Sequence, residues 1–175
     1  MNLLEEIRMA QIDRLEQSRQ KLIDFTLTEQ FLNLSLTINE FTEDQEIERI
    51  ANIIPVTGRF IYYFSSAETP RVIASFTDYT DSANKRSRYN DQHLISPCLY
   101  VGSSKSLRKR FKEHCGICNK ATYALKFKNW IKDHPIQLEF HYCEIHTDDQ
   151  EILQNLEDGL WLRLKPVFGK YGGKY

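Results

Sequence analysis

The sequence has no uninterrupted run of about 18 apolar residues, the length that a membrane-spanning helix needs. Its first eight residues hold Glu5 and Glu6, where a secretion signal would carry positive charge and an apolar core. We therefore expect a chain that does not span a membrane and that stays in the cytoplasm. Its 175 residues suffice for one domain, or for one domain with an extension.

Cysteine is scarce, with four residues, and there is one Cys-x-x-Cys pair where a complete zinc site of this kind has two. That pair is Cys115 and Cys118, and the residues able to complete a site with it are His114, Cys143 and His146. Free cysteines are common in protein cores, and an intracellular chain keeps its thiols reduced. The sequence therefore favours four reduced cysteines over a zinc site.

The chain also lacks a strong net charge, at −1, but its charges are unevenly distributed. Residues 1–57 carry a net charge of −6 and residues 58–175 a net charge of +5. Residues 101–130 hold eight lysines and arginines and one acid. A basic patch on a nearly neutral chain indicates a polyanionic partner, and a solvated surface is the alternative interpretation.

Hydrophobic periodicity divides the chain near residue 57. Residues 1–57 are predicted to be an acidic helical extension, with one helix over 2–25 capped by Asn2 and one or two more over 27–56. The rest, 58–175, is predicted to be one domain with a polar insertion at about 65–97. Its fold class is expected to be α/β (α+β), a small mixed β-sheet flanked by helices. The strands are expected at 60–64, 71–76, 99–102 and 138–145, and the helices at about 105–116, 121–131 and 150–164.

The most informative stretch is residues 99–114, where a short apolar strand ends at Gly102 and a basic helix follows. On this helix Leu107 and Phe111 form an apolar stripe, and Arg110 and His114 lie one turn apart on its flank. A helix that needed only solubility would keep a guanidinium and an imidazole away from its buried side. The pattern therefore predicts a chemical role for both.

A carboxylate stands in the apolar sector of the last predicted helix. Glu157 falls among Leu153, Leu160 and Leu164 on the helical wheel. Burying an unpaired carboxylate is costly, so such a group is paired with a cation, protonated or bound to metal. An ion pair with arginine or lysine and a Mg²⁺ site with water and phosphate oxygens are the two interpretations.

In order along the chain, these residues resemble the GIY-YIG nuclease family. Tyr62 lies on the first strand, Tyr100-Val101-Gly102 on a later one, Arg110 and His114 on the basic helix, and Glu157 on the last helix. The resemblance covers about residues 58–170, and restriction-enzyme members of the family diverge and carry insertions in a similar way. It implies a nuclease fold.

Three features depart from the family pattern. Phe60 stands where the family's first glycine would be, and Tyr63 competes with Tyr62 as the first tyrosine. The two strand motifs are 38 residues apart, from Tyr62 to Tyr100, because of the insertion. Gly169 occupies the position of the family's late asparagine, so another residue must replace it or the site differs in detail.

The resemblance implies a DNA endonuclease that hydrolyses phosphodiester bonds with Mg²⁺ or Mn²⁺. Glu157 would hold the cation, Arg110 would bind the phosphate, and Tyr62 or Tyr100 would orient or deprotonate the attacking water. His114, with an ordinary pKa near 6.5, is predicted to carry the proton.

Double-stranded DNA is the expected partner. The cations predicted to meet its phosphates are Lys105, Arg108, Lys109, Lys112, Lys126 and Lys128, and those predicted to read bases from the insertion are Lys85, Arg86 and Arg88. A homodimer through the N-terminal helices would allow both strands to be cut. A restriction-type enzyme is the leading hypothesis. The alternatives are a DNA-binding or zinc-supported module without catalysis, and a repair or mobile-element nuclease.

Overall fold

The computed structural model describes residues 2–39, 42–78, 89–132 and 134–172. None of the described helices is both long and apolar enough to span a lipid bilayer. The elements in chain order are α1 (Leu3–Asp24), β1 (Leu32–Ile38), α2 (Asp44–Ala51), β2 (Phe60–Ser65), α3 (Thr69–Thr77), the 3-10 helix η1 (Asp91–His93), β3 (Cys98–Ser104), α4 (Leu107–Cys115), the 3-10 helix η2 (Phe127–Asn129), β4 (Ile136–Glu144) and α5 (Gln150–Leu164).

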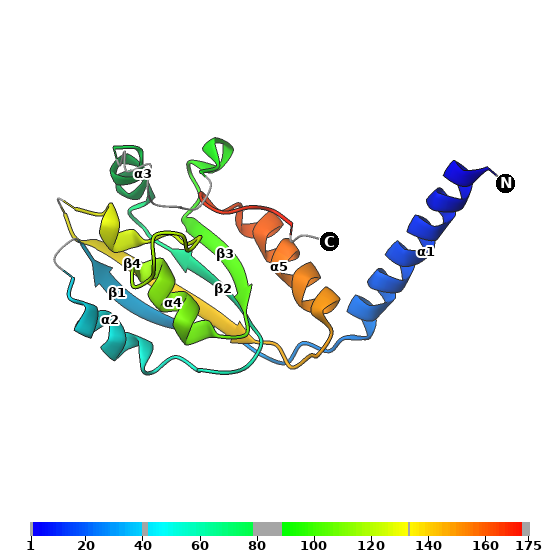
Figure 1. The fold of residues 1–175 in the computed structure, drawn as a ribbon, viewed down its shortest axis with the longest axis horizontal. Helices are drawn as coiled ribbons and strands as arrows, with labels where there is room; N and C mark the ends of the chain where they lie inside the picture. The colour runs from blue at the N-terminus through cyan, green and yellow to red at the C-terminus, as the bar shows by residue number, and fades with distance from the viewer. Residues whose placement is uncertain (1, 40–41, 79–88, 133, 173–175) are drawn as a thin grey trace.

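The four strands form an antiparallel sheet in the order β1–β4–β2–β3 (Figure 1). The predicted α/β class is confirmed, and the sheet is antiparallel where a mixed sheet was expected. Strand β2 is central, and Tyr62 lies opposite Gly102 of β3 and Tyr142 of β4. The middle of β2 is therefore enclosed by strands on both sides and by helices above and below.

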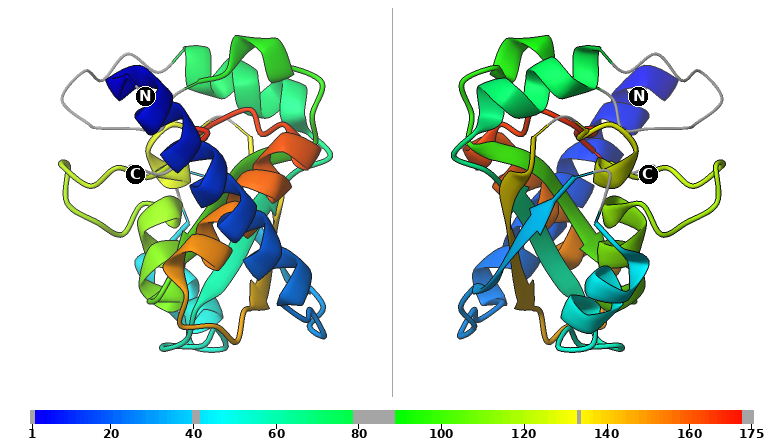
Figure 2. Two further views of the ribbon diagram at one scale, coloured as in Figure 1. Left: turned by 90° about the vertical axis from the view of Figure 1, so that its right-hand side faces the viewer. Right: turned by 90° about the vertical axis from the view of Figure 1, so that its left-hand side faces the viewer.

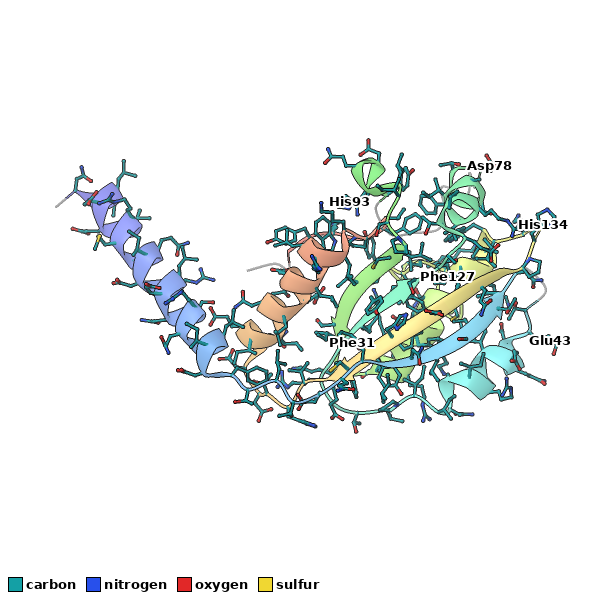
Figure 3. All side chains as sticks on the ribbon, turned by 180° about the vertical axis from the view of Figure 1, so that it is seen from behind. Phe31, Glu43, Asp78, His93, Phe127 and His134 are labelled. Atoms are coloured by element: carbon teal, nitrogen blue, oxygen red, sulfur yellow. The ribbon has the colours of Figure 1, made fainter. Side chains whose placement is uncertain are left out.

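The two faces of the sheet are covered by different helices. Tyr62 and Phe64 of β2 lie in the main core, together with Phe111 of α4 and residues of α2. Ile61, which points the other way, packs in a smaller cluster with Leu153 of α5. Seen from behind in Figure 3, β1 and β4 have no helix in front of them. Helices α4 and α5 thus approach β2 and β3 from opposite faces.

Helix α1 stands away from the sheet in Figure 1, and the left view of Figure 2 looks onto α1 with α5 and the sheet behind it. The helix predicted over residues 2–25 is confirmed, and the side chain of Asn2 accepts the backbone N–H of Glu5 as its cap. No residue of α1 is buried. Near its C-terminal end, Lys21 Nζ lies 3.0 Å from Asp149 and 2.7 Å from Glu151 at the start of α5.

The prediction that residues 27–56 are helical is correct for α2 and wrong for β1. Leu32, Leu34, Leu36 and Ile38 alternate with polar residues, which is the period of a strand and not of a helix. Strand β1 pairs with β4 along its whole length. The sheet therefore includes residues on both sides of position 57.

Two further predictions were wrong. Residues 71–76, predicted as a strand, lie in α3, where Pro70 in the first turn favours a helix and Val72 and Phe76 are buried one turn apart. Residues 121–131, predicted as a helix, form only η2. Lys126 has a positive φ of 56°, and this left-handed residue interrupts a helix at that point.

Candidate active site

Arg110 of α4 connects the two strand tyrosines. Its Nε donates to the hydroxyl oxygen of Tyr62 at 3.2 Å, and one terminal nitrogen donates to the hydroxyl oxygen of Tyr100 at 3.3 Å. The other terminal nitrogen donates to Glu113 at 2.9 Å, one turn along the same helix. The guanidinium is therefore fixed by groups from β2, β3 and α4.

Tyr62, and not Tyr63, lies beside Arg110. The alternation of β2 turns Tyr63 to the opposite face, where its ring stacks on His141 with centroids 4.2 Å apart. Tyr62 and Tyr100 stack with centroids 6.1 Å apart. The two phenols that contact Arg110 thus come from neighbouring strands on one face of the sheet.

The glycine of the Tyr-Val-Gly motif has a steric reason. Gly102 faces Tyr62 across the β2–β3 pair, and a Cβ at position 102 would lie 2.6 Å from the Tyr62 hydroxyl oxygen. Any larger residue would therefore displace the Tyr62 ring from Arg110. The glycine of this motif therefore leaves room for the Tyr62 side chain on the neighbouring strand β2.

His114, one turn after Arg110 on α4, is fully buried and contacts the same hydroxyl of Tyr62. Its Nδ1 accepts the backbone N–H of Leu125 at 3.2 Å, and its Nε2 lies 3.1 Å from the Tyr62 hydroxyl oxygen. Burial, and then the charge of Arg110, lower the pKa of His114 well below its ordinary value. A neutral imidazole that accepts at Nδ1 carries its proton on Nε2. His114 therefore donates to Tyr62, and its role as proton carrier stays a prediction.

This burial predicts a dependence of stability on pH. In the unfolded chain His114 takes up a proton below about pH 6.5, whereas in the folded chain it stays neutral until a lower pH. Its contribution to stability is complete above pH 6.5 and is lost as the pH falls below it, by at most about 1.4 kcal/mol per pH unit. The measurement is the free energy of unfolding by urea at pH 7.5, 6.5 and 5.5. In His114→Gln this free energy is expected to fall less steeply with decreasing pH than in the native chain.

The exposed His134 on the loop before β4 gives a matched control. The chain with His134→Gln is expected to keep the native dependence of unfolding free energy on pH. If His114→Gln and the native chain show the same slope, His114 is not held neutral by the fold.

Both active-site phenols are neutral in this structure. Burial raises the pKa of Tyr62 well above its ordinary value, with the charge of Tyr100 acting in the same direction. Burial also raises the pKa of Tyr100. The positive charge of Arg110 opposes both increases, so the guanidinium is the group that favours a phenolate here.

Glu157 of α5 is near enough to Tyr62 and Tyr100 for its charge to affect the pKa of both phenols. Its carboxylate accepts the hydroxyl of Ser103 on β3 at 2.5 Å. Burial raises the pKa of Glu157, which the Ser103 hydrogen bond and the charge of Arg110 oppose. No lysine or arginine among the described residues forms an ion pair with it within 4.0 Å. The carboxylate therefore has no cationic partner, which excludes the ion-pair interpretation within the described part of the chain.

A carboxylate such as that of Glu157 offers the oxygen atoms that a hard divalent cation prefers. Within the described ranges, no group of three or more His, Cys, Asp or Glu side chains could hold a metal ion. A Mg²⁺ or Mn²⁺ site needs few carboxylates, because water and phosphate oxygens complete it. Glu157 is the residue here that could supply such an oxygen. All four cysteines are free, and Cys115 of the Cys-x-x-Cys pair is buried in the main core.

Some of the predicted DNA-binding cations are exposed, and others are bonded to groups within the chain. Lys105 and Lys109 are exposed, and Lys109 Nζ lies 4.0 Å from Glu113. Arg108 donates instead to the backbone oxygens of Asn52 and Ile54, so it holds the end of α2. Lys85, Arg86 and Arg88 lie outside the described residues.

Three further lysines of that set have partners within the chain. Lys112 lies 3.0 Å from Glu48, and Lys128 lies 2.5 Å from Asp44. Lys126 is buried, and its Nζ donates to the backbone oxygen of Lys120 at 2.7 Å. Lys126 therefore does not lie on the surface that a duplex would meet.

Gly169 packs against the active site from behind. It has a φ of +104°, and a Cβ there would lie 3.1 Å from the Tyr100 ring. The side-chain amide of Asn90 donates to the backbone oxygens of Pro166 at 3.0 Å and Gly169 at 3.2 Å. An asparagine of the predicted insertion thus holds the segment in which the family's late asparagine is missing.

The comparison with protein families is decisive at this point. A model of the GIY-YIG catalytic domain matches residues 81–171, slightly more than half of the chain. The chain belongs to the GIY-YIG family. This domain is that of a nuclease, so the enzyme is of endonuclease type with DNA as its substrate, and GIY-YIG nucleases typically use divalent metals. Neither the curated proteins nor the solved structures contain a match.

Sequence reasoning missed several residues that position this GIY-YIG site. Glu113 follows Arg110 by three residues, a spacing from which its contact was predictable. Ser103 lies within the motif but was not assigned to Glu157. The backbone N–H of Leu125 and the side chain of Asn90 had no sequence signal, because each reaches the site through a turn or an insertion.

Proposed function

We propose that this protein is a sequence-specific, divalent-metal-dependent DNA endonuclease of the restriction type. The observation that supports the proposal is the convergence at one place of the Arg110 guanidinium, the phenols of Tyr62 and Tyr100, and the Glu157 carboxylate. In phosphodiester hydrolysis negative charge accumulates on the phosphoryl oxygens, so catalysis is mostly positioning and electrostatic stabilisation. This group of residues has the charges and donors that such a reaction needs.

Each residue has a proposed task. Arg110 binds a phosphate oxygen with the hydrogens that its tyrosine and Glu113 contacts leave free. Tyr62 orients the attacking water through its own hydroxyl hydrogen, since its oxygen already accepts from Arg110 and His114. To accept the proton of the water, Tyr62 must first lose its own proton to solvent, and the same two donors stabilise the phenolate that remains.

Glu157 would hold a Mg²⁺ or Mn²⁺ ion, with Ser103 fixing the orientation of the carboxylate. When bound, the cation would polarise the phosphate and stabilise the departing oxygen. The raised pKa of Glu157 means that protons compete with the cation at a higher pH than for an exposed glutamate. The active site is therefore expected to lose its metal as the solution becomes acidic.

Binding of the duplex is assigned to the exposed Lys105 and Lys109, which give affinity without sequence preference. Cutting both strands is assigned to a homodimer formed through α1. This helix has no buried residue, so its apolar side chains are exposed and available to a second copy of the chain. The exposed apolar residues of this helix are Leu3, Leu4, Ile7, Met9, Ile12, Leu15, Leu22 and Ile23. We place the protein in the cytoplasm, where its four free thiols stay reduced.

The test is incubation of the purified chain with plasmid and phage DNA in Mg²⁺, Mn²⁺ or EDTA, followed by sequencing of the DNA ends. Metal-dependent ends at one recurring sequence support the restriction-type proposal. Cleavage of flaps or branches in preference to a plain duplex supports a repair or mobile-element nuclease.

Gly169 favours a DNA-binding or zinc-supported module without catalysis, and binding with no cleavage in any metal would support that candidate. Sedimentation of the chain with and without α1 tests the homodimer.

A further inference from the structure

A pocket lies between η1 and the C-terminal end of α5. It has a volume of about 270 Å³. Three rings line it, those of His93, Trp161 and Tyr171, and they contact one another: the centroid of Trp161 lies 5.1 Å from that of His93 and 5.1 Å from that of Tyr171. Gln92 and Lys170 add an amide and a cation to the same wall. We refer to this place as the Trp161 pocket.

The unsatisfied indole nitrogen of Trp161 suggests that this place binds a ligand. Trp161 Nε1 is buried and has no hydrogen-bond partner among the described residues. Native proteins rarely leave a buried N–H unsatisfied, because the group has lost its water without replacement. A ligand that brings an acceptor to this nitrogen would remove that cost.

The pocket is close to the candidate catalytic residues. Trp161 follows Glu157 by four residues on α5, so the two side chains share one face and are separated by about 6 Å along the helix axis. On the other side, Lys170 Nζ lies 5.6 Å from the ring centroid of Tyr123. Tyr123 is near enough to Tyr100 for its charge to affect the pKa of that phenol. A group bound here is therefore a neighbour of whatever occupies the active site.

The chemistry of the lining fits one nucleobase. Stacking between aromatic side chains and a cation for the backbone are the features with which proteins bind unpaired nucleotides. Base edges carry the acceptors that Trp161 Nε1 lacks, and Asp91 and Gln92 can bond to their amino groups. The volume lies just below the usual range of small-molecule sites, roughly 300–1,000 Å³, which suits a single base better than a base pair.

We propose that the Trp161 pocket binds one base of the cleaved strand, displaced from the helix next to the scissile phosphate. This inference rests on the proposed nuclease function and specifies how the enzyme holds its substrate. A base within a duplex cannot enter such a pocket, so it must first unstack. Trp161 Nε1 is itself buried, so a base must displace a neighbouring side chain to reach it.

Intrinsic fluorescence tests the proposal without catalysis. The chain has two tryptophans, and Trp130 is buried in the core, so a ligand that stacks in the pocket acts on Trp161. The native chain in EDTA is titrated with deoxynucleoside monophosphates and with deoxyribose 5-phosphate. Saturable quenching by the nucleotides, absent with the sugar phosphate, is expected. Equal responses to both would overturn the proposal, because the base would then contribute nothing.

Substitutions then assign the effect to the pocket. Trp161→Ala is expected to weaken binding of a single-stranded oligonucleotide at least about fivefold, the lower end for one base stack. Trp161→Phe, which keeps the ring and is expected to fold even if the alanine variant does not, should fall between the native chain and Trp161→Ala. Leu162→Ala changes an exposed neighbour on α5 outside the pocket and should bind like the native chain. Unchanged affinity in both folded Trp161 variants overturns the inference.

The two proposals fail in different ways. Metal-dependent DNA cleavage together with no base-dependent quenching would leave the nuclease function standing and remove the pocket. Base-dependent quenching without cleavage in any divalent metal would remove the nuclease function and leave a nucleotide-binding protein.

Discussion

Replacing Glu157 with glutamine is expected to reduce metal-dependent DNA cleavage by about a thousandfold. The amide keeps the size of the side chain and can still accept the Ser103 hydroxyl, but it carries no charge for a divalent cation. A bound cation contributes several kcal/mol to stabilisation of the transition state, and 1.36 kcal/mol corresponds to a factor of ten in rate. Because burial already raises the pKa of Glu157, removing its charge is expected to relieve a desolvation cost, and the variant should be at least as stable as the native chain.

The measurement is the rate of plasmid nicking as a function of Mn²⁺ concentration, with urea unfolding as the test of the fold. Glu151→Gln is the matched control, since it makes the same substitution on α5 at a carboxylate that pairs with Lys21 of α1 and lies outside the candidate site. This control is expected to cut at nearly the native rate. Native-like cleavage by Glu157→Gln would show that the cation is held elsewhere.

Replacing Arg110 with lysine is expected to slow cleavage by roughly a hundred- to a thousandfold, the usual effect of losing one preorganised donor to a developing negative charge. Lysine retains the positive charge but has a single nitrogen, whereas Arg110 reaches Tyr62, Tyr100 and Glu113 with three. The two phenols would lose their shared donor. The loss is expected mainly in kcat, because lysine still attracts the phosphate.

The matched control is Arg49→Lys on α2. Arg49 also pairs with an acid three residues away, Glu46, but on the exposed surface outside the site. Single-turnover rates at saturating DNA separate the two variants, with Arg49→Lys expected to match the native chain. Equal rates for Arg110→Lys and Arg49→Lys would contradict the assigned role of the guanidinium.

The elements predicted correctly are those whose pattern is local. The helix capped by Asn2 and the helix that ends at Gly116 in a left-handed conformation were both readable from their termini. Strand β1 was missed although its Leu-polar alternation is regular, because the acidic residues around it suggested a continuing helix. The region around Lys126 was missed because its backbone is set by buried contacts of Trp130 and Leu125, which no spacing encodes.

The candidate site was predictable to the extent that its residues lie on regular elements. The contacts of Arg110 with Tyr62 and Tyr100 were predictable, because they need only neighbouring strands with a helix on one face. The role of His114 was not predictable, because its tautomer depends on the backbone N–H of Leu125, eleven residues later in an irregular turn. The contact of Arg108 was not predictable either, since it bonds to the end of a helix that the sequence did not place beside it.

The route of the C-terminal segment has a practical consequence for handling the protein. Val167 and Phe168 bond through their backbones to Cys98 and Leu99 at the start of β3, so the end of the chain passes directly behind Tyr100. The opposite terminus begins on α1, far from the sheet (Figure 1). An affinity tag or fluorescent label ahead of Leu3 therefore stays clear of the active site, although it adjoins the helix proposed for the dimer contact, whereas a fusion directly after Gly172 begins at the wall of the Trp161 pocket, which Lys170 and Tyr171 line.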